Sequence, residues 1–219
     1  NPGLGLEAVI KNLGFNNFTF DWLINPDFAI YTVVIAGVWQ ASGFVMALFL
    51  AGVCYEHREV SLKNKPSHMI KISPKGTVPV LFGKDFLLEE SLDIVLWAFL
   101  QKPSESEMAW VKRNDTDFKK NLDICKYKIR FSEEEFLKAK EFCFSFLGEM
   151  NLVLENKKIL SGDKIGFLDI CLFPFARQFS RIKPDLLGEV SLDSLIRWLE
   201  DIESSTLFEK VMLKYELWE

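Results

Sequence analysis

The chain has 219 residues and a net charge of −5, and its acidic and basic residues are interspersed rather than clustered. That distribution argues against a nucleic-acid-binding surface, which would need a basic patch. The four cysteines, none in a CxxC pair, and the two histidines argue against a zinc site or a disulfide framework, so we expect no metal. The length accommodates two modest domains with their own cores.

An uncharged stretch dominates the start of the chain. Residues 1–27 carry four charged side chains, and none occurs from residue 28 to residue 55. The stretch exceeds the roughly 20 apolar residues that span a bilayer as a helix. It also fits a buried strand at 29–35, rich in β-branched residues, followed by a buried helix at 41–52. Both interpretations stay open, although the lack of a basic flank and a cleavage site argues against a secretory signal peptide.

An α/β pattern follows this stretch. The predicted elements are, in order, a strand at 55–62, a short helix that ends before Pro74, a β-hairpin of 77–82 and 86–90 joined by GKD, and a helix at 91–101 with Ser91 as its N-cap. This order is typical of the second half of a small α/β domain.

The chain beyond a polar linker at 102–107 is predicted to be helical. Apolar residues at helical spacing define two core-facing stripes: Val111, Phe118, Leu122, Cys125 and Ile129, and then Phe136, Ala139, Cys143, Phe146, Met150 and Val153. Ser132 and Glu135 form a capping-box pattern before the second stripe. Further helices are predicted at 167–179, central and bent at Pro174, and at 192–202 and 206–218.

A family resemblance is carried by the segment at 62–99, LKNKPSHMIKISPKGTVPVLFGKDFLLEESLDIVLWAF. It resembles the glutathione S-transferase family, nearest to its bacterial stringent-starvation, omega-like and related cysteine-type members. The resemblance extends over about residues 46–219. It implies the glutathione S-transferase fold, with an α/β thioredoxin-like domain at 28–101 and an all-α domain at 107–219, after an atypical appendage at 1–27.

The same resemblance implies a glutathione site. In TVPVL the bond between Val78 and Pro79 is expected to be cis and to turn the Val78 backbone toward the cysteinyl backbone of glutathione. Glu90 and Ser91 match the family's acid–serine pair, in which the acid takes the γ-glutamyl ammonium and the start of the helix binds its carboxylate. Lys65 matches a lysine that reaches the glycyl carboxylate.

The central-helix motif of the family is also present, with one departure. Asp169 is in place, but Gly166 stands where a Ser or Thr usually caps the helix. Because glycine has no side-chain acceptor, this helix start is expected to be weakened by roughly a few tenths of a kcal/mol.

The catalytic loop of the family is missing. Counting back without gaps, its reactive cysteine and the following proline fall on Val38 and Trp39, so the catalytic residue is unknown; the nearby Gln40 and Ser42 are not assigned. Residues 1–52 instead resemble part of a sugar-type ABC transporter permease. The two resemblances meet within 46–52, which indicates a chimera. The segments 29–35 and 41–52 could still replace the lost first strand and helix.

The resemblance implies a cytoplasmic protein that uses glutathione as co-substrate, with a small electrophile or a disulfide as partner, and forms a homodimer. Activity is expected to be impaired by the loss of the catalytic loop. A non-enzymatic binding or scaffold protein of the same fold is the first alternative. A permease fragment is the second, with membrane contact only through 28–52.

Overall fold

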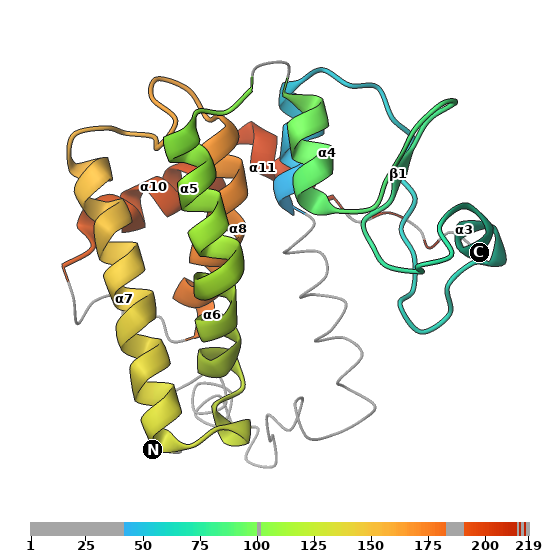
Figure 1. The fold of residues 1–219 in the computed structure, drawn as a ribbon. Helices are drawn as coiled ribbons and strands as arrows, with labels where there is room; N and C mark the ends of the chain where they lie inside the picture. The colour runs from blue at the N-terminus through green and yellow to red at the C-terminus, as the bar shows by residue number, and fades with distance from the viewer. Residues whose placement is uncertain (1–41, 100–101, 183–190, 214, 216, 218–219) are drawn as a thin grey trace, which may run out of the picture. The chain divides into compact units, whose positions relative to one another are not determined.

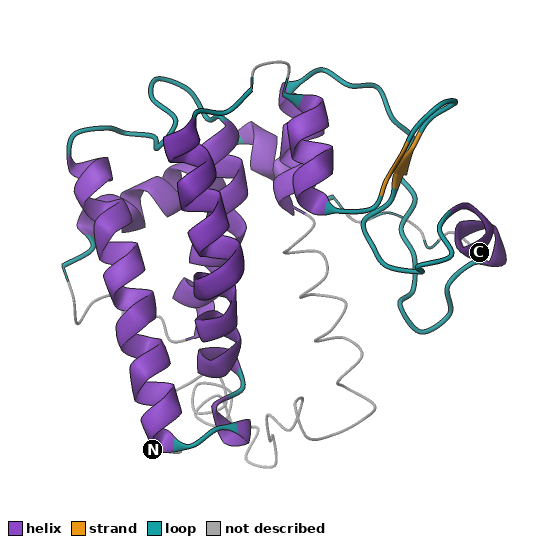
Figure 2. Cartoon of the chain, viewed as in Figure 1, coloured by secondary structure: helices purple, strands orange, loops and turns teal. Residues whose placement is uncertain are grey.

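A computed structural model describes residues 42–99, 102–182, 191–213, 215 and 217 (Figures 1 and 2). The chain divides into two compact units, 1–38 and 39–219, and all described residues belong to the second unit. The expectations for the appendage, for a strand at 29–35 and for Val38, Trp39 and Gln40 lie outside the described residues.

The described part begins with a helix over residues 42–50. Its side chains Val45, Met46, Ala47 and Leu48 are at most 5% exposed and belong to the main hydrophobic core. The predicted helix is therefore confirmed over these residues. Among the described residues, no helix is long and apolar enough to cross a membrane.

The α/β region contains α3 (Ser67–Ile72), β1 (Leu81–Phe82), β2 (Leu87–Leu88) and α4 (Ser91–Ala98). The two strands pair antiparallel with Leu81 opposite Leu88, and the turn closes with a hydrogen bond from the Gly83 N–H to the Phe86 carbonyl. The predicted hairpin and the short helix before Pro74 are thus confirmed, although the ladder is shorter than expected.

The predicted strand at 55–62 is wrong. This segment is extended, but within the described chain its backbone makes a single bridge, between Glu59 and Leu217. A strand needs a ladder of hydrogen bonds to neighbouring backbone, which local composition cannot supply.

The helical region contains α5 (Glu105–Arg113), η2 (Asn114–Phe118), α6 (Lys119–Lys126), η3 (Lys128–Arg130), α7 (Glu133–Glu155), α8 (Phe167–Ile182), α10 (Asp193–Glu203) and α11 (Thr206–Val211). Figure 1 shows α6, α7 and α8 side by side, and α6 packs against both of the others. The predicted capping box of Ser132 and Glu135 is confirmed. Ser104 and Glu107 form a second one, so α5 begins inside the predicted linker.

The two predicted stripes face the core except at their ends. Ile129 is 88% exposed because α6 ends at Lys126, so the residue no longer follows helical periodicity. Val153 is only partly buried, and Leu154 is buried in its place. The last predicted helix also ends early, at Val211. Local spacing thus predicts a stripe but not where its helix stops.

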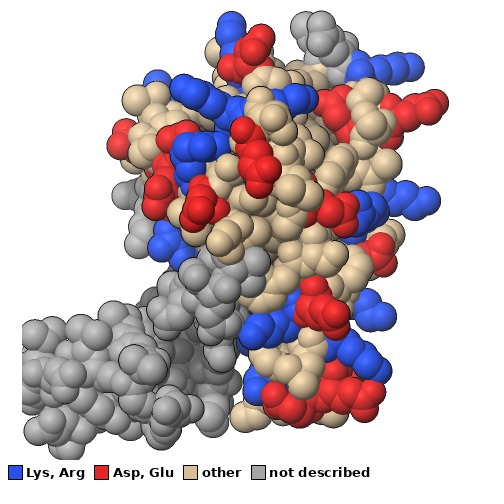
Figure 3. Space-filling view, turned by 90° about the vertical axis from the view of Figure 1, so that its left-hand side faces the viewer, with Lys and Arg blue, Asp and Glu red and all other residues tan. Residues whose placement is uncertain are grey.

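On the face of the molecule that Figure 3 shows, acidic and basic side chains of the described residues lie next to one another. One such pair joins two helices: the guanidinium of Arg113 on α5 donates to both carboxylate oxygens of Glu149 on α7, each at 2.8 Å. This hydrogen bonding lowers the pKa of Glu149.

The start of α8 is capped from outside the helix, which corrects the expectation of a weakened start. The Ser161 hydroxyl accepts hydrogen bonds from the backbone N–H groups of Leu168 and Asp169, at 3.1 and 3.4 Å. A Cβ atom at Gly166 would lie 2.7 Å from Ser161 Cβ. Ser161 thus takes the place that a capping side chain at position 166 would occupy.

The start of α10 follows the same principle. Its N-cap residue is Leu192, which has no polar side chain, and the amide oxygen of Asn151 on α7 accepts from the Leu195 N–H at 3.0 Å instead. Two helix starts in this domain therefore depend on residues outside the helix that they cap.

Exchanging the cap of α8 tests this account. We expect Ser161→Gly to lower the free energy of unfolding by about 0.5–2 kcal/mol, because two backbone donors lose their acceptor. Gly166→Ser alone should also destabilise, because its Cβ meets Ser161. The double variant S161G/G166S should be more stable than either single variant in urea unfolding. If the double variant instead lost the sum of the two single-variant stability losses, residue 166 could not take over the capping role of Ser161.

Candidate functional site

The loop between α3 and β1 positions the predicted backbone contact. The Gly76 N–H donates to the Ser73 carbonyl at 2.9 Å, and Gly76 has φ +62°, a left-handed conformation suited to glycine. The bond between Val78 and Pro79 is cis, as predicted, and Val78 is 43% exposed. The turn therefore presents Val78 at the surface.

The start of α4 differs from the prediction in one respect. The N-cap residue is Glu90, in an extended conformation, and Ser91 is the exposed first residue of the helix. No side chain caps this helix start. The first N–H groups of an α-helix have no partner within the helix, and they attract anions. The start of α4 can thus accept a carboxylate.

Charged groups from three segments meet at this loop. Lys75 Nζ forms an ion pair with Glu90 Oε1, and this hydrogen bond raises the pKa of Lys75. Glu89 accepts a hydrogen bond of 2.5 Å from the buried Ser73 hydroxyl. Lys65 Nζ lies 3.9 Å from the position of a Cβ on Gly76. The structure thus brings Lys65 to the same loop as the pair of Lys75 and Glu90.

Lys75 is a residue that the sequence analysis missed. The signal available was its position in SPKG, directly before the glycine turn and three residues before Val78. The turn at Gly76 reverses the chain, and the hairpin brings the start of α4 back to the loop between α3 and β1. The Lys75 side chain therefore reaches the start of α4.

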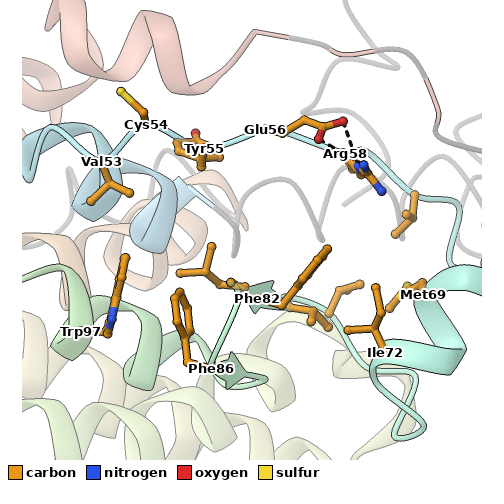
Figure 4. A pocket seen from close by; sticks show the side chains of 15 residues that line it. Val53, Cys54, Tyr55, Glu56, Arg58, Met69, Ile72, Phe82, Phe86 and Trp97 are labelled. Carbon is orange, nitrogen blue, oxygen red and sulfur yellow. Dashed lines mark hydrogen bonds and ion pairs between the residues drawn. The ribbon is translucent and has the colours of Figure 1, made fainter.

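A cavity of about 510 Å³ lies between the extended segment 53–60 and the hairpin with α3 and α4 (Figure 4). Cys54, Tyr55 and Arg58 line one side, and Figure 4 shows Phe86 and Trp97 across from them. The two aromatic rings stack with centroids 5.0 Å apart. The cavity therefore combines apolar walls with a few polar groups, as small-molecule sites do.

The predicted site residues are only partly shared with this cavity. Val78 lines it, whereas Lys65, Pro79, Glu90 and Ser91 do not. The predicted residues gather at the loop and helix start, and Val78 connects that cluster with the cavity.

The cysteines give little support for thiol chemistry. Cys54 is exposed and lines the cavity, but it follows the helix at 42–50, whereas thiolates are stabilised at helix N-termini. Cys125 and Cys143 are buried, and burial raises the pKa of Cys171 to about 12. The described residues contain no group of three or more side chains suited to a metal ion.

Family models match most of the described chain. The model described as "Glutathione S-transferase, N-terminal domain" matches residues 44–107, and "Glutathione S-transferase, C-terminal domain" matches residues 94–206. "Glutathione S-transferase U4" of Arabidopsis thaliana is 30% identical over 192 residues, which cover 78% of this chain and 84% of that protein.

Solved structures show the same fold. The mango protein "Tau class glutathione S-transferase MiGSTU" superposes with a TM-score of 0.66 at 22% identity, covering 80% of this chain and 90% of that one. A "glutathione transferase family member from Pseudomonas fluorescens", described "with two glutathione bound", also gives 0.66, at 15% identity and coverages of 79% and 88%. The fold is a thioredoxin-like α/β domain plus an all-α domain, as predicted.

A separate similarity concerns a short part of the chain. "Xylose/arabinose import permease protein XacH" of Haloferax volcanii is 46% identical over 48 residues, which cover 22% of this chain and 14% of that protein.

Proposed function

Because the chain belongs to the glutathione S-transferase family, we propose that it binds reduced glutathione through Lys65, Val78, Pro79, Glu90 and Ser91. One observation carries this proposal: the exposed backbone of Val78, the carboxylate of Glu90 and two lysines, Lys65 and Lys75, lie at one loop. The glutathione-bound relative from Pseudomonas fluorescens supports the choice of ligand.

Each part of the ligand has a chemically matched partner. The backbone of the exposed Val78 pairs with the cysteinyl backbone. The γ-glutamyl carboxylate meets the uncapped start of α4 at Ser91, and the ammonium meets Glu90. Lys75 forms its ion pair with Oε1 of Glu90, and in this proposal Oε2 accepts from the ammonium. Lys65 attracts the glycyl carboxylate.

We propose that the chemistry is transfer of glutathione to a small electrophile, or exchange of its thiol with a disulfide, and that both are impaired. The family's reactive position falls on Val38 and Trp39, neither of which donates a proton to or accepts one from a thiol. Membership of the glutathione S-transferase family further supports a cytoplasmic homodimer. We place the chain nearest the omega-like or stringent-starvation-like members, on the match at Lys65.

We propose the domain limits 28–101 and 107–219 after an appendage at 1–27, and a permease-derived origin for residues 1–52 with its junction within 46–52. The short similarity to the permease supports that origin. The family model that begins at residue 44 supports the position of the junction.

We propose two alternative functions, each favoured by one observation. The missing nucleophile favours a non-enzymatic binding or scaffold protein of the same fold. The 48-residue permease similarity favours a membrane fragment. A chain that binds glutathione without turnover would be of the first kind, and one that is extracted only with detergent would be of the second.

Titration calorimetry with reduced glutathione tests the site. We expect saturable binding by the full chain and a loss of about 10- to 100-fold in affinity when Glu90→Ala and Ser91→Ala are combined, because a charge-assisted contact and an anion site are removed. Asp85→Ala, an exposed acid in the hairpin turn, is the matched control and should bind normally. A folded chain without binding, or equal affinities of the double variant and the control, would refute the proposed site.

A further inference from the structure

The extended segment 55–60 has two sides with different neighbours. Tyr55 lines the cavity, and from residue 56 on the contacts alternate: Glu56, Arg58 and Val60 line it, whereas His57 and Glu59 do not. Alternate residues of an extended chain point to opposite sides. The segment is therefore a thin wall with the cavity on its inner side and another neighbour on its outer side.

The outer neighbour is the C-terminal chain. The His57 ring stacks on the Tyr215 ring, with centroids 4.0 Å apart and an interplanar angle of 17°. Two residues further along both chains, Glu59 and Leu217 form a parallel bridge. Equal two-residue steps along both chains indicate strand-like parallel pairing in a single register.

We propose that the outer edge of residues 55–60 is a docking site for the protein's own C-terminal chain around Tyr215 and Leu217, which holds this wall of the cavity in place. The proposal goes beyond glutathione binding and does not depend on it. The Glu59 bridge is the only backbone pairing of the segment with another described segment. Without it the wall would lack a fixed register within the described chain.

The ring contacts give the docking its specificity. Tyr55, which lines the cavity, also lies beside His57, with ring centroids 6.3 Å apart, so the His57 ring lies between the cavity wall and the docked Tyr215 ring. Burial and the nearby Tyr215 hydroxyl raise the pKa of Tyr55. Leu217 is 59% exposed and Tyr215 is 41% exposed. A contact with so little buried area opens more readily than the core, so the docked chain is held reversibly on the segment.

Hydrogen exchange of the full chain, read by mass spectrometry, tests the docking. We expect Tyr215→Ala to speed backbone exchange in residues 55–60 by about tenfold, which is the scale of losing one aromatic pair. Tyr215→Phe keeps the ring and should exchange as the unchanged chain does. Tyr127→Ala, which removes a tyrosine from the end of α6, is the matched control. Exchange in α7 reports global stability.

Faster exchange confined to residues 55–60 in Tyr215→Ala, with Tyr215→Phe and Tyr127→Ala unchanged, supports the docking. Unchanged exchange at 55–60 in Tyr215→Ala overturns it, as does an equal acceleration in α7. Protection at 55–60 that falls when the unchanged chain is diluted also overturns it, because the docked chain would then come from a second copy.

Discussion

Asp169→Ala is expected to lower the free energy of unfolding by about 3–5 kcal/mol. The side chain is fully buried at the first turn of α8. One carboxylate oxygen accepts from the Leu160 N–H and from Trp198 Nε1, both at 2.9 Å, and the other accepts from the N–H groups of Ser161 and Gly166, both at 3.1 Å. Alanine leaves four donors without an acceptor, two of them on residues that are themselves buried, and it removes the hydrogen bond from Trp198 on α10 to α8.

Urea unfolding measures this effect, with two companion variants. Asp169→Asn keeps one carbonyl oxygen, so it should retain part of the network and fall between the alanine variant and the unchanged chain. Asp163→Ala removes an exposed acid from the same loop and should change stability by less than about 0.5 kcal/mol. If Asp169→Ala and Asp163→Ala unfolded at the same urea concentration, the buried network would not be a major source of stability.

Gly43→Ala is expected to destabilise the chain by about 1–3 kcal/mol, although alanine favours helices more than glycine does. A Cβ atom at this position would lie 2.9 Å from the Ile170 carbonyl oxygen and 3.2 Å from Pro174 Cγ. Both atoms are held in α8, so the helix at 42–50 would have to move away from the core.

Gly148→Ala is the matched control for this prediction. Gly148 lies in α7, and nothing lies within 4 Å of a Cβ atom placed there. The substitution should therefore stabilise the chain by about 0.5–1 kcal/mol through helix propensity. Thermal or urea unfolding should thus show opposite signs for two identical substitutions in two helices. If both substitutions stabilised the chain, the helix at 42–50 would not pack closely on α8.

The candidate site could be predicted from sequence only where a motif ties residues together. TVPVL predicted the cis bond at Val78, and EES predicted a helix start at residue 91, although the cap proved to be Glu90. Lys75 escaped notice because its ion pair with Glu90 spans 15 residues. The assignment of the five site residues to glutathione stays a prediction.

The sequence by itself determined the elements whose signals are local. Helical periodicity predicted the buried faces of α6 and α7, the capping box of Ser132 and Glu135 predicted the start of α7, and two short apolar runs around a turn predicted the hairpin. These signals act within about one helical turn or one hairpin, so they are present in any window of the sequence that contains the element.

Only the tertiary structure decided how the remaining backbone groups are satisfied. The starts of α8 and α10 take their acceptors from Ser161 and Asn151, and the extended segment at 55–60 takes its one bridge from Leu217 rather than from a ladder of its own. Packing brings such partners together, and the spacing of residues in the sequence does not predict them. The hydrogen bonds must be made by some group, but which group makes them is settled when the helices come together.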